Sequence, residues 1–187
     1  MLAGQLPRGC VEKLEMSAPF EIIVGRIETL ALDAVVNAAN RQLMPGSGVD
    51  GALRTAAGPK LTEATNRIPP ILTGEAVLTP GFDAPMKFII HTAAPVWTDE
   101  GPQSAKVAGL AKCYTSAIKM AASRGFESIA FPCLGTGIYR WPRGFACGIA
   151  VAACEQELVN APKLKRVVFC CFTEDDAKIY RDGLGVS

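Results

Sequence analysis

Residues 128–139 read SIAFPCLGTGIY, and they join a short apolar strand to a glycine-rich loop. The segment Ser128–Phe131 has the continuous apolar character of a strand that is buried on both faces. In α/β proteins, ligands bind beyond the carboxyl ends of such strands. This stretch therefore predicts a parallel sheet whose strand ends carry functional loops.

The same alternation of strand and helix patterns extends in both directions along the chain. The other predicted strands are Phe20–Val24, Asp33–Val36, Glu75–Leu78, Lys87–His91 and Arg166–Phe172. The predicted helices are Val49–Ala57, Gln103–Arg124, Pro142–Leu158 and Glu174–Asp182. We expect an α/β fold, a three-layer α-β-α sandwich with a mixed, largely parallel central sheet. One domain is expected over residues 19–187, preceded by an N-terminal extension over residues 1–18.

Length and charge limit the classes of protein that this chain can belong to. With 187 residues, 49% hydrophobic and 20% charged, the chain suits one folded domain with a substantial core. A net charge of +1 gives no basic stripe of the kind that binds duplex nucleic acid, so we do not expect a nucleic-acid partner. An anionic ligand stays open, because backbone amides bind phosphate without excess lysine.

The seven cysteines form no CxxC pair, and His91 is the single histidine. No zinc-finger spacing can be assembled from them, so no metal site is expected. Several cysteines lie in apolar runs, where a free thiol behaves as a small buried hydrophobe. We expect reduced thiols and a cytoplasmic protein, with no membrane span and no signal peptide.

Two glycine loops follow predicted strands. Gly46, Ser47 and Gly48 precede the helix that starts near Val49, and the second loop begins at Gly135. Glycine permits close backbone approach, and a helix start presents unpaired amides that suit a phosphate. Either loop alone is equally compatible with an ordinary turn; together they can hold a diphosphate from both sides. No Walker motif and no GxGxxG motif occurs, which disfavours a nucleoside triphosphatase.

Four segments in order, VVNAAN (35–40), GSGVDGAL (46–53), IIHTAAPVW (89–97) and FPCLGTGIYRWP (131–142), carry a resemblance that spans residues 20–185. They are similar to the motifs of the macrodomain family, and most closely to its MacroD-like class. The resemblance implies a macrodomain that binds ADP-ribose or its esters and needs no cofactor.

The resemblance also assigns roles to individual residues. Asn40 is expected to bind the distal ribose, and Asp50 to act beside the scissile bond, chiefly by orienting a water. Asn37 is interpreted as bracing the loop, and His91 as a satisfied histidine without a catalytic role. The remaining expected ligand-binding residues are Ile27, Gly46, Ser47, Gly48, Val49, Gly135, Thr136, Gly137, Ile138, Tyr139 and Phe172.

Two positions depart from the family pattern. Arg26 stands where macrodomains usually have an aspartate that accepts a hydrogen bond from adenine, and arginine has no acceptor. Glu28 is a candidate substitute for that acceptor. Gly135 stands where MacroD-like proteins commonly have serine. Two functions stay open: hydrolysis of ADP-ribose esters, on O-acetyl-ADP-ribose or on mono-ADP-ribosylated acidic side chains of proteins, and a non-catalytic ADP-ribose reader.

Overall fold

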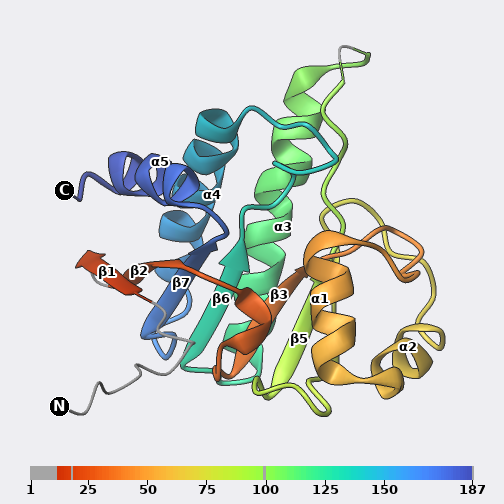
Figure 1. The fold of residues 1–187 in the computed structure, drawn as a ribbon. Helices are drawn as coiled ribbons and strands as arrows, with labels where there is room; N and C mark the ends of the chain where they lie inside the picture. Colours follow the sequence, from red (N-terminus) through yellow and green to blue (C-terminus); the bar gives the residue numbers. More distant parts are fainter. Residues whose placement is uncertain (1–11, 18, 99, 187) are drawn as a thin grey trace, which may run out of the picture.

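The computed structural model describes residues 12–17, 19–98 and 100–186. A seven-stranded sheet with the order β1-β2-β7-β6-β3-β5-β4 forms its centre (Figure 1). The five inner strands are parallel, whereas β1 and β4 pair antiparallel at the two edges. The predicted mixed, largely parallel sheet is confirmed.

The elements alternate along the chain as the sequence patterns predict. The strands are β1 Glu12–Ser17, β2 Phe20–Val24, β3 Ala34–Ala38, β4 Ala76–Pro80, β5 Phe88–Thr92, β6 Ser128–Pro132 and β7 Arg166–Cys171. The helices are η1 Ile27–Thr29, α1 Gly48–Ala57, α2 Pro59–Thr65, α3 Gln103–Ser123, α4 Arg143–Leu158 and α5 Glu174–Leu184.

Alternate residues of each inner strand point to opposite faces, and the two faces are covered by different helices (Figure 1). Phe131 and Phe169 pack with α3, α4 and α5 in the larger cluster of buried residues. Ala130 and Val168, one step away, pack with α1, α2 and η1 on the other face. The predicted three-layer sandwich follows from this division.

Three elements, β1, η1 and α2, were not predicted. The strand β1 falls within the segment that we expected to be an N-terminal extension, and it pairs with β2 from Glu12↔Val24 to Ser17↔Phe20. The predicted domain boundary after residue 18 itself stays a prediction. Gly58, with φ of 76°, ends α1 as predicted, but Pro59 then starts the seven-residue helix α2. Proline suits a first helical turn because it lacks the N–H that would be unpaired there.

The parallel strands all direct their carboxyl ends to one edge of the sheet. The segments that follow β2, β3, β5, β6 and β7 therefore meet there, although they are far apart in sequence (Figure 1). Within the part of the chain that the structure describes, no helix combines the length and hydropathy needed to cross a membrane.

Candidate functional site

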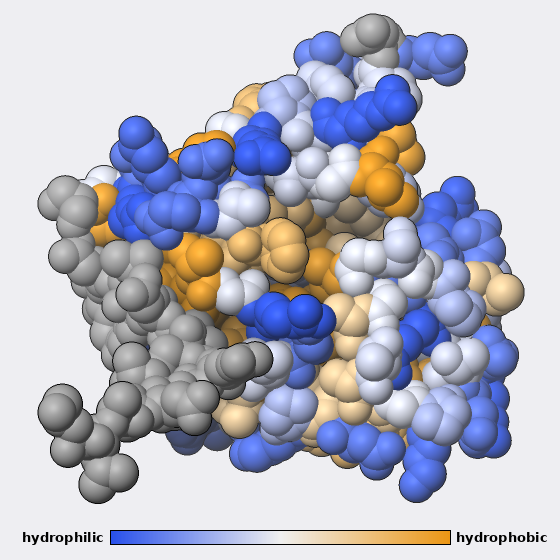
Figure 2. Space-filling view, viewed as in Figure 1, coloured by the Kyte–Doolittle hydropathy of each residue, from blue (hydrophilic) through white to orange (hydrophobic). Residues whose placement is uncertain are grey.

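A cavity of about 550 Å³ lies at this edge of the sheet. Figure 2 shows the same face of the molecule, with a hollow floored by apolar side chains between polar rims. The structure brings every site residue predicted from the sequence to the cavity wall: Ile27, Asn40, Gly46, Ser47, Gly48, Val49, Asp50, Gly135, Thr136, Gly137, Ile138, Tyr139 and Phe172. Residues spread over almost 150 positions of sequence thus line one hollow.

The first glycine loop ends directly at the N-terminus of α1. Gly48 is the first residue of the helix and has φ of 60°, a conformation that residues with a side chain rarely adopt. The preceding Ser47 makes no side-chain cap to the helix. The amides in the first turn of α1 therefore receive no hydrogen bond from the Ser47 side chain. A helix start whose amides have no side-chain cap favours the binding of an anion.

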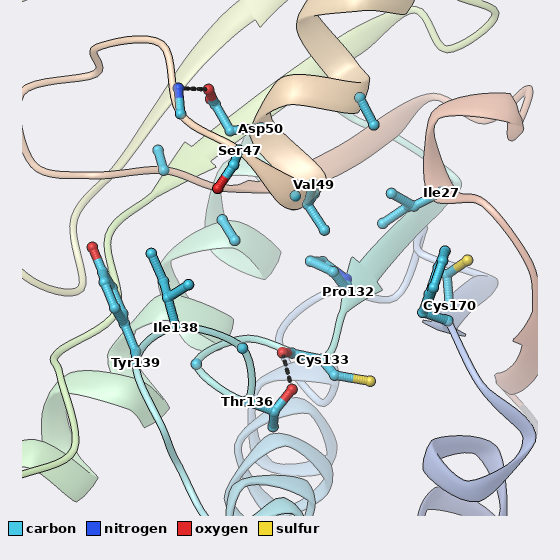
Figure 3. A pocket seen from close by; sticks show the side chains of 18 of the residues that line it. Ile27, Ser47, Val49, Asp50, Pro132, Cys133, Thr136, Ile138, Tyr139 and Cys170 are labelled. Carbon is cyan, nitrogen blue, oxygen red and sulfur yellow. Dashed lines mark hydrogen bonds between the residues drawn. The ribbon is translucent and has the colours of Figure 1, made fainter.

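Asp50 holds this loop in place. Its Oδ2 accepts a hydrogen bond from the Gly46 amide at 2.7 Å (Figure 3). The same oxygen accepts a second hydrogen bond from Arg54 Nε, also at 2.7 Å. Its Oδ1 accepts from Asn37 Nδ2, also at 2.7 Å. Both ionic side chains are almost buried, with 5% of Asp50 and 9% of Arg54 exposed. Three donors thus fix the carboxylate, while one edge of the residue still faces the cavity.

Arg54 extends the brace to the far side of the loop. Its guanidinium donates to the Leu43 carbonyl at 2.9 Å and to the hydroxyls of Thr62 and Thr65 at 3.0 and 3.2 Å. The ion pair therefore connects the first glycine loop, α1 and the otherwise unpredicted α2.

His91 lies behind the carboxylate and does not reach the cavity. It is fully buried in β5, with Nδ1 3.0 Å from Asn37 Nδ2 and Nε2 2.8 Å from Thr79 Oγ1. Burial lowers the pKa of His91 to about 4; the Asp50 charge opposes this shift and the Arg54 charge adds to it. The structure agrees with the expectation of a satisfied histidine, and it places Asn37 as the brace between His91 and Asp50.

Asn40 lies at the opposite end of the first loop. Its side-chain amide donates to the Met44 carbonyl at 2.8 Å and accepts from the Met44 amide at 3.1 Å. These bonds close the turn over residues 40–44 and fix the direction of the side chain at the cavity wall.

The second glycine loop is shaped by Trp141. Gly135 has φ of 82°, and a Cβ atom there would lie 2.6 Å from Trp141 Cδ1. Trp141 is itself anchored, because its Nε1 donates to the Pro95 carbonyl at 2.8 Å. The departure from serine at position 135 thus has a physical reason: in this chain the indole occupies the space that a side chain would need. Ile138 and Tyr139 project into the opening of the cavity (Figure 3).

The other departure from the family pattern, Arg26, lies at the remaining end of the cavity. Arg26 Nε donates to Glu28 Oε1 at 2.6 Å; the Arg26 side chain is 68% exposed, whereas that of Glu28 is 10% exposed. Both residues line the cavity, with Ile27 between them. Phe172 follows β7 and leaves 78% of its surface exposed at the same end. A buried carboxylate and an open aromatic face thus occupy the side of the cavity that the resemblance assigns to a base.

The sequence analysis did not name several residues of the cavity wall as site residues, among them Cys133, Cys170 and Asp176. Cys133 lies immediately before the second glycine loop, so its place after a predicted strand was an available signal. Cys170 and Asp176 reach the cavity through strand alternation and the packing of α5, which no local motif reveals.

The fold and the cavity define an α/β protein with a nucleotide-sized site built from two glycine loops at the strand ends. The chain belongs to the Macro domain family, whose model matches residues 36–150. It is 42% identical to a macro domain-containing protein of Chlorobaculum tepidum, over 84% of this chain and 91% of the relative. It is 38% identical to a protein of an Enterobacter species named O-acetyl-ADP-ribose deacetylase, over 89% of this chain and 93% of that protein.

A solved structure supports the same assignment. The macrodomain of Trypanosoma brucei, crystallised in complex with ADP-ribose, superposes with a TM-score of 0.83 at 35% identity. The match covers 89% of this chain and 69% of that protein.

Proposed function

We propose that this protein binds ADP-ribose in the cavity and hydrolyses ADP-ribose esters, with O-acetyl-ADP-ribose and mono-ADP-ribosylated aspartate or glutamate side chains as the substrate class. The observation that carries the proposal is the convergence of both glycine loops, Asn40 and Asp50 on one cavity of about 550 Å³. This volume lies within the roughly 300–1,000 Å³ usual for small-molecule sites.

Each wall of the cavity suits one part of the ligand. The amides at the start of α1 and those of the second glycine loop suit the diphosphate, because both present N–H groups to an anion. The Asn40 amide both donates and accepts, which matches a vicinal diol of the distal ribose. Glu28 and Phe172 lie at the end where the adenine base would stack.

Asp50 supports hydrolysis as an acceptor for water. A carboxylate offers about four acceptor sites, and Asn37, Gly46 and Arg54 take three of them. The remaining site is available to a water between Asp50 and the diphosphate, next to the ester-bearing ribose. In this arrangement Asp50 and the phosphate orient the water, and Asn40 holds the ribose that it attacks.

The reader function is the second candidate, and one observation favours it. Asp50 is so fully engaged in bracing the first loop that its position is explained without catalysis. Names of relatives such as O-acetyl-ADP-ribose deacetylase support the hydrolase over the reader.

The deciding experiment measures binding and turnover on one preparation. Calorimetry with ADP-ribose is expected to give micromolar affinity, roughly −7 to −9 kcal/mol. Release of ADP-ribose from glutamate-linked protein and of acetate from O-acetyl-ADP-ribose is expected at the same time. Binding without turnover establishes the reader, and the absence of both contradicts the proposal.

Mono-ADP-ribosylated proteins are the partner class that this activity implies, and we also propose a cytoplasmic location. The six cysteines within the described residues are all free thiols, which suits a reducing compartment. Fractionation of cells that express the tagged chain tests the location.

A further inference from the structure

Two cysteines at the carboxyl ends of the adjacent strands β6 and β7 face each other at the base of the second glycine loop. Cys133 directly follows β6, and Cys171 is the last residue of β7. Their sulfur atoms lie 3.9 Å apart. The two strands are parallel and paired as far as Pro132↔Cys170, so the next step of the register brings Cys133 opposite Cys171.

Strand spacing allows these two thiols to be joined. Neighbouring strands lie about 4.7–4.9 Å apart, which is within the Cα separation of about 4.4–6.8 Å that disulfides require. From these positions we infer that Cys133 and Cys171 form an oxidative modification site, at which a peroxide converts the two thiols to a disulfide beneath the ligand cavity.

The two thiols differ in their accessibility from the cavity, and this difference determines which of them reacts first. Cys133 is partly exposed and lines the cavity, whereas Cys171 is fully buried. A hydrogen bond with Cys133 and burial together hold the pKa of Cys171 far above its usual range, so this thiol is the less reactive of the two toward a peroxide. A peroxide entering the cavity therefore reaches Cys133 first.

The chemistry balances with a peroxide as the oxidant. The Cys133 sulfur attacks one peroxide oxygen, the O–O bond breaks, and Cys133 becomes a sulfenic acid while the other oxygen leaves as water. The Cys171 sulfur then attacks the sulfenic sulfur while its proton passes to the sulfenic hydroxyl, the S–O bond breaks, and that hydroxyl leaves as a second water. Two thiols lose two electrons in total, and one hydrogen peroxide is reduced to two waters.

The neighbouring Cys170 also lines the cavity, but it does not compete. Strand alternation directs its side chain to the opposite face of the sheet, where its sulfur lies 3.7 Å from the Gly25 carbonyl. Cys171 and Cys133 belong to the face covered by α3, α4 and α5. The pairing is therefore specific to Cys133 and Cys171.

Closing the bridge disturbs the second glycine loop. The sulfurs must approach from 3.9 Å to about 2.05 Å, which displaces Cys133. Thr136 is tied to the Cys133 carbonyl through both its amide and its hydroxyl, at 3.3 and 2.9 Å, so the displacement passes into the loop (Figure 3). Because Trp141 packs against Gly135, the loop has no room to adjust to the displacement of Cys133. If the cavity binds ADP-ribose as proposed, oxidation weakens that binding.

Peptide mapping under non-reducing conditions tests the site without any nucleotide. After treatment of the full chain with hydrogen peroxide, we expect a linked peptide pair containing Cys133 and Cys171 that is lost on addition of dithiothreitol. Cys171→Ala removes the linked pair and leaves Cys133 sulfenic acid that dimedone traps, whereas the matched control Cys170→Ala still forms the linked pair. Cys133 found only as sulfinic or sulfonic acid in the unsubstituted chain, or a bridge to Cys170, overturns the inference.

Calorimetry with ADP-ribose on the oxidised and re-reduced protein tests the effect on the cavity. Oxidation is expected to weaken the affinity at least tenfold, with recovery after reduction. Unchanged affinity of fully bridged protein overturns this part of the inference. Absence of binding to the reduced protein contradicts the proposed function instead, and leaves the mapping result unaffected.

Discussion

Two nearly buried ionic side chains, Asp50 and Arg54, lie 2.7 Å apart beneath the first glycine loop. At the scale of single residues, they join a carboxylate that faces the cavity to the carbonyl of Leu43 and the hydroxyls of α2. Removing one member of a buried ion pair leaves its partner uncompensated, which typically costs about 3–5 kcal/mol. Any variant of Asp50 therefore changes stability as well as chemistry, and its design has to separate the two.

Asp50→Asn is expected to lower ester turnover by about 10²–10⁴-fold, the usual effect of losing a positioned acid or base. Part of the ADP-ribose affinity should remain, because the diphosphate contacts come from backbone amides. The matched control is Arg54→Met, which breaks the same brace but leaves the carboxylate at the cavity. Turnover and calorimetric affinity are measured for both. Equal losses of turnover in the two variants would show that Asp50 serves only as a brace.

Glu28→Met is expected to weaken ADP-ribose binding by about 0.5–1.5 kcal/mol, because we propose its buried carboxylate as the acceptor that Arg26 cannot supply. Inosine diphosphate ribose lacks the amino donor, so its affinity should hardly change. Calorimetry with both nucleotides gives the comparison. The exposed Arg26→Met serves as control with a smaller effect. Equal weakening for both nucleotides would contradict a role of Glu28 in recognising the base.

At the scale of elements, the second glycine loop depends on contacts with a neighbouring segment. Trp141 packs on Gly135, lies tilted against the ring of Trp97 at a centroid distance of 4.7 Å, and stacks with Phe145 at 6.2 Å. The Trp97 amide also donates to the Tyr139 carbonyl at 2.8 Å. The segment after β5 therefore supports the loop after β6.

Gly135→Ala is expected to lower the free energy of unfolding by about 1–3 kcal/mol, because the new methyl group meets Trp141 and the backbone has a positive φ. Gly137→Ala is the matched control for stability, since no atom lies within 4 Å of a Cβ at that position. Urea unfolding of the two variants tests the difference. A loss as large for Gly137→Ala as for Gly135→Ala would contradict the role of Trp141.

At the scale of the whole molecule, the buried His91 links folding to pH. Its pKa of about 4 in the folded protein lies below the usual 6.5, because burial disfavours the charged ring. Between these values the unfolded chain binds the proton more readily than the folded one. His91 thus contributes its full stability above about pH 6.5, and this contribution is lost as the pH falls toward 4.

We expect the loss from His91 between pH 7 and 4 to be about 3 kcal/mol, at about 1.36 kcal/mol for each unit of pKa difference. The measurement compares urea unfolding of the unsubstituted protein and of His91→Gln across this range. The difference between them isolates the histidine from the titrating carboxylates. Parallel pH profiles for the two proteins would show that His91 does not carry the dependence.

The local patterns of the sequence determined the order of most elements and the identity of the glycine loops. Apolar runs such as Ser128–Phe131 and stop signals such as Gly58 act within a few residues, so they can be interpreted without the fold. The ordered macrodomain motifs also determined which residues reach the cavity, because the carboxyl ends of parallel strands must meet at one edge.

Only the tertiary structure decided which contacts those residues make. The bonds from Asn37, Gly46 and Arg54 to Asp50, and the contact of Trp141 with Gly135, join positions that no short-range pattern relates. The strand β1 likewise depends on its antiparallel pairing with β2, which its own sequence does not indicate. The facing of Cys133 and Cys171 depends on the register of β6 against β7. The pairing of two strands depends on both segments, so it cannot be predicted from the sequence of either one alone.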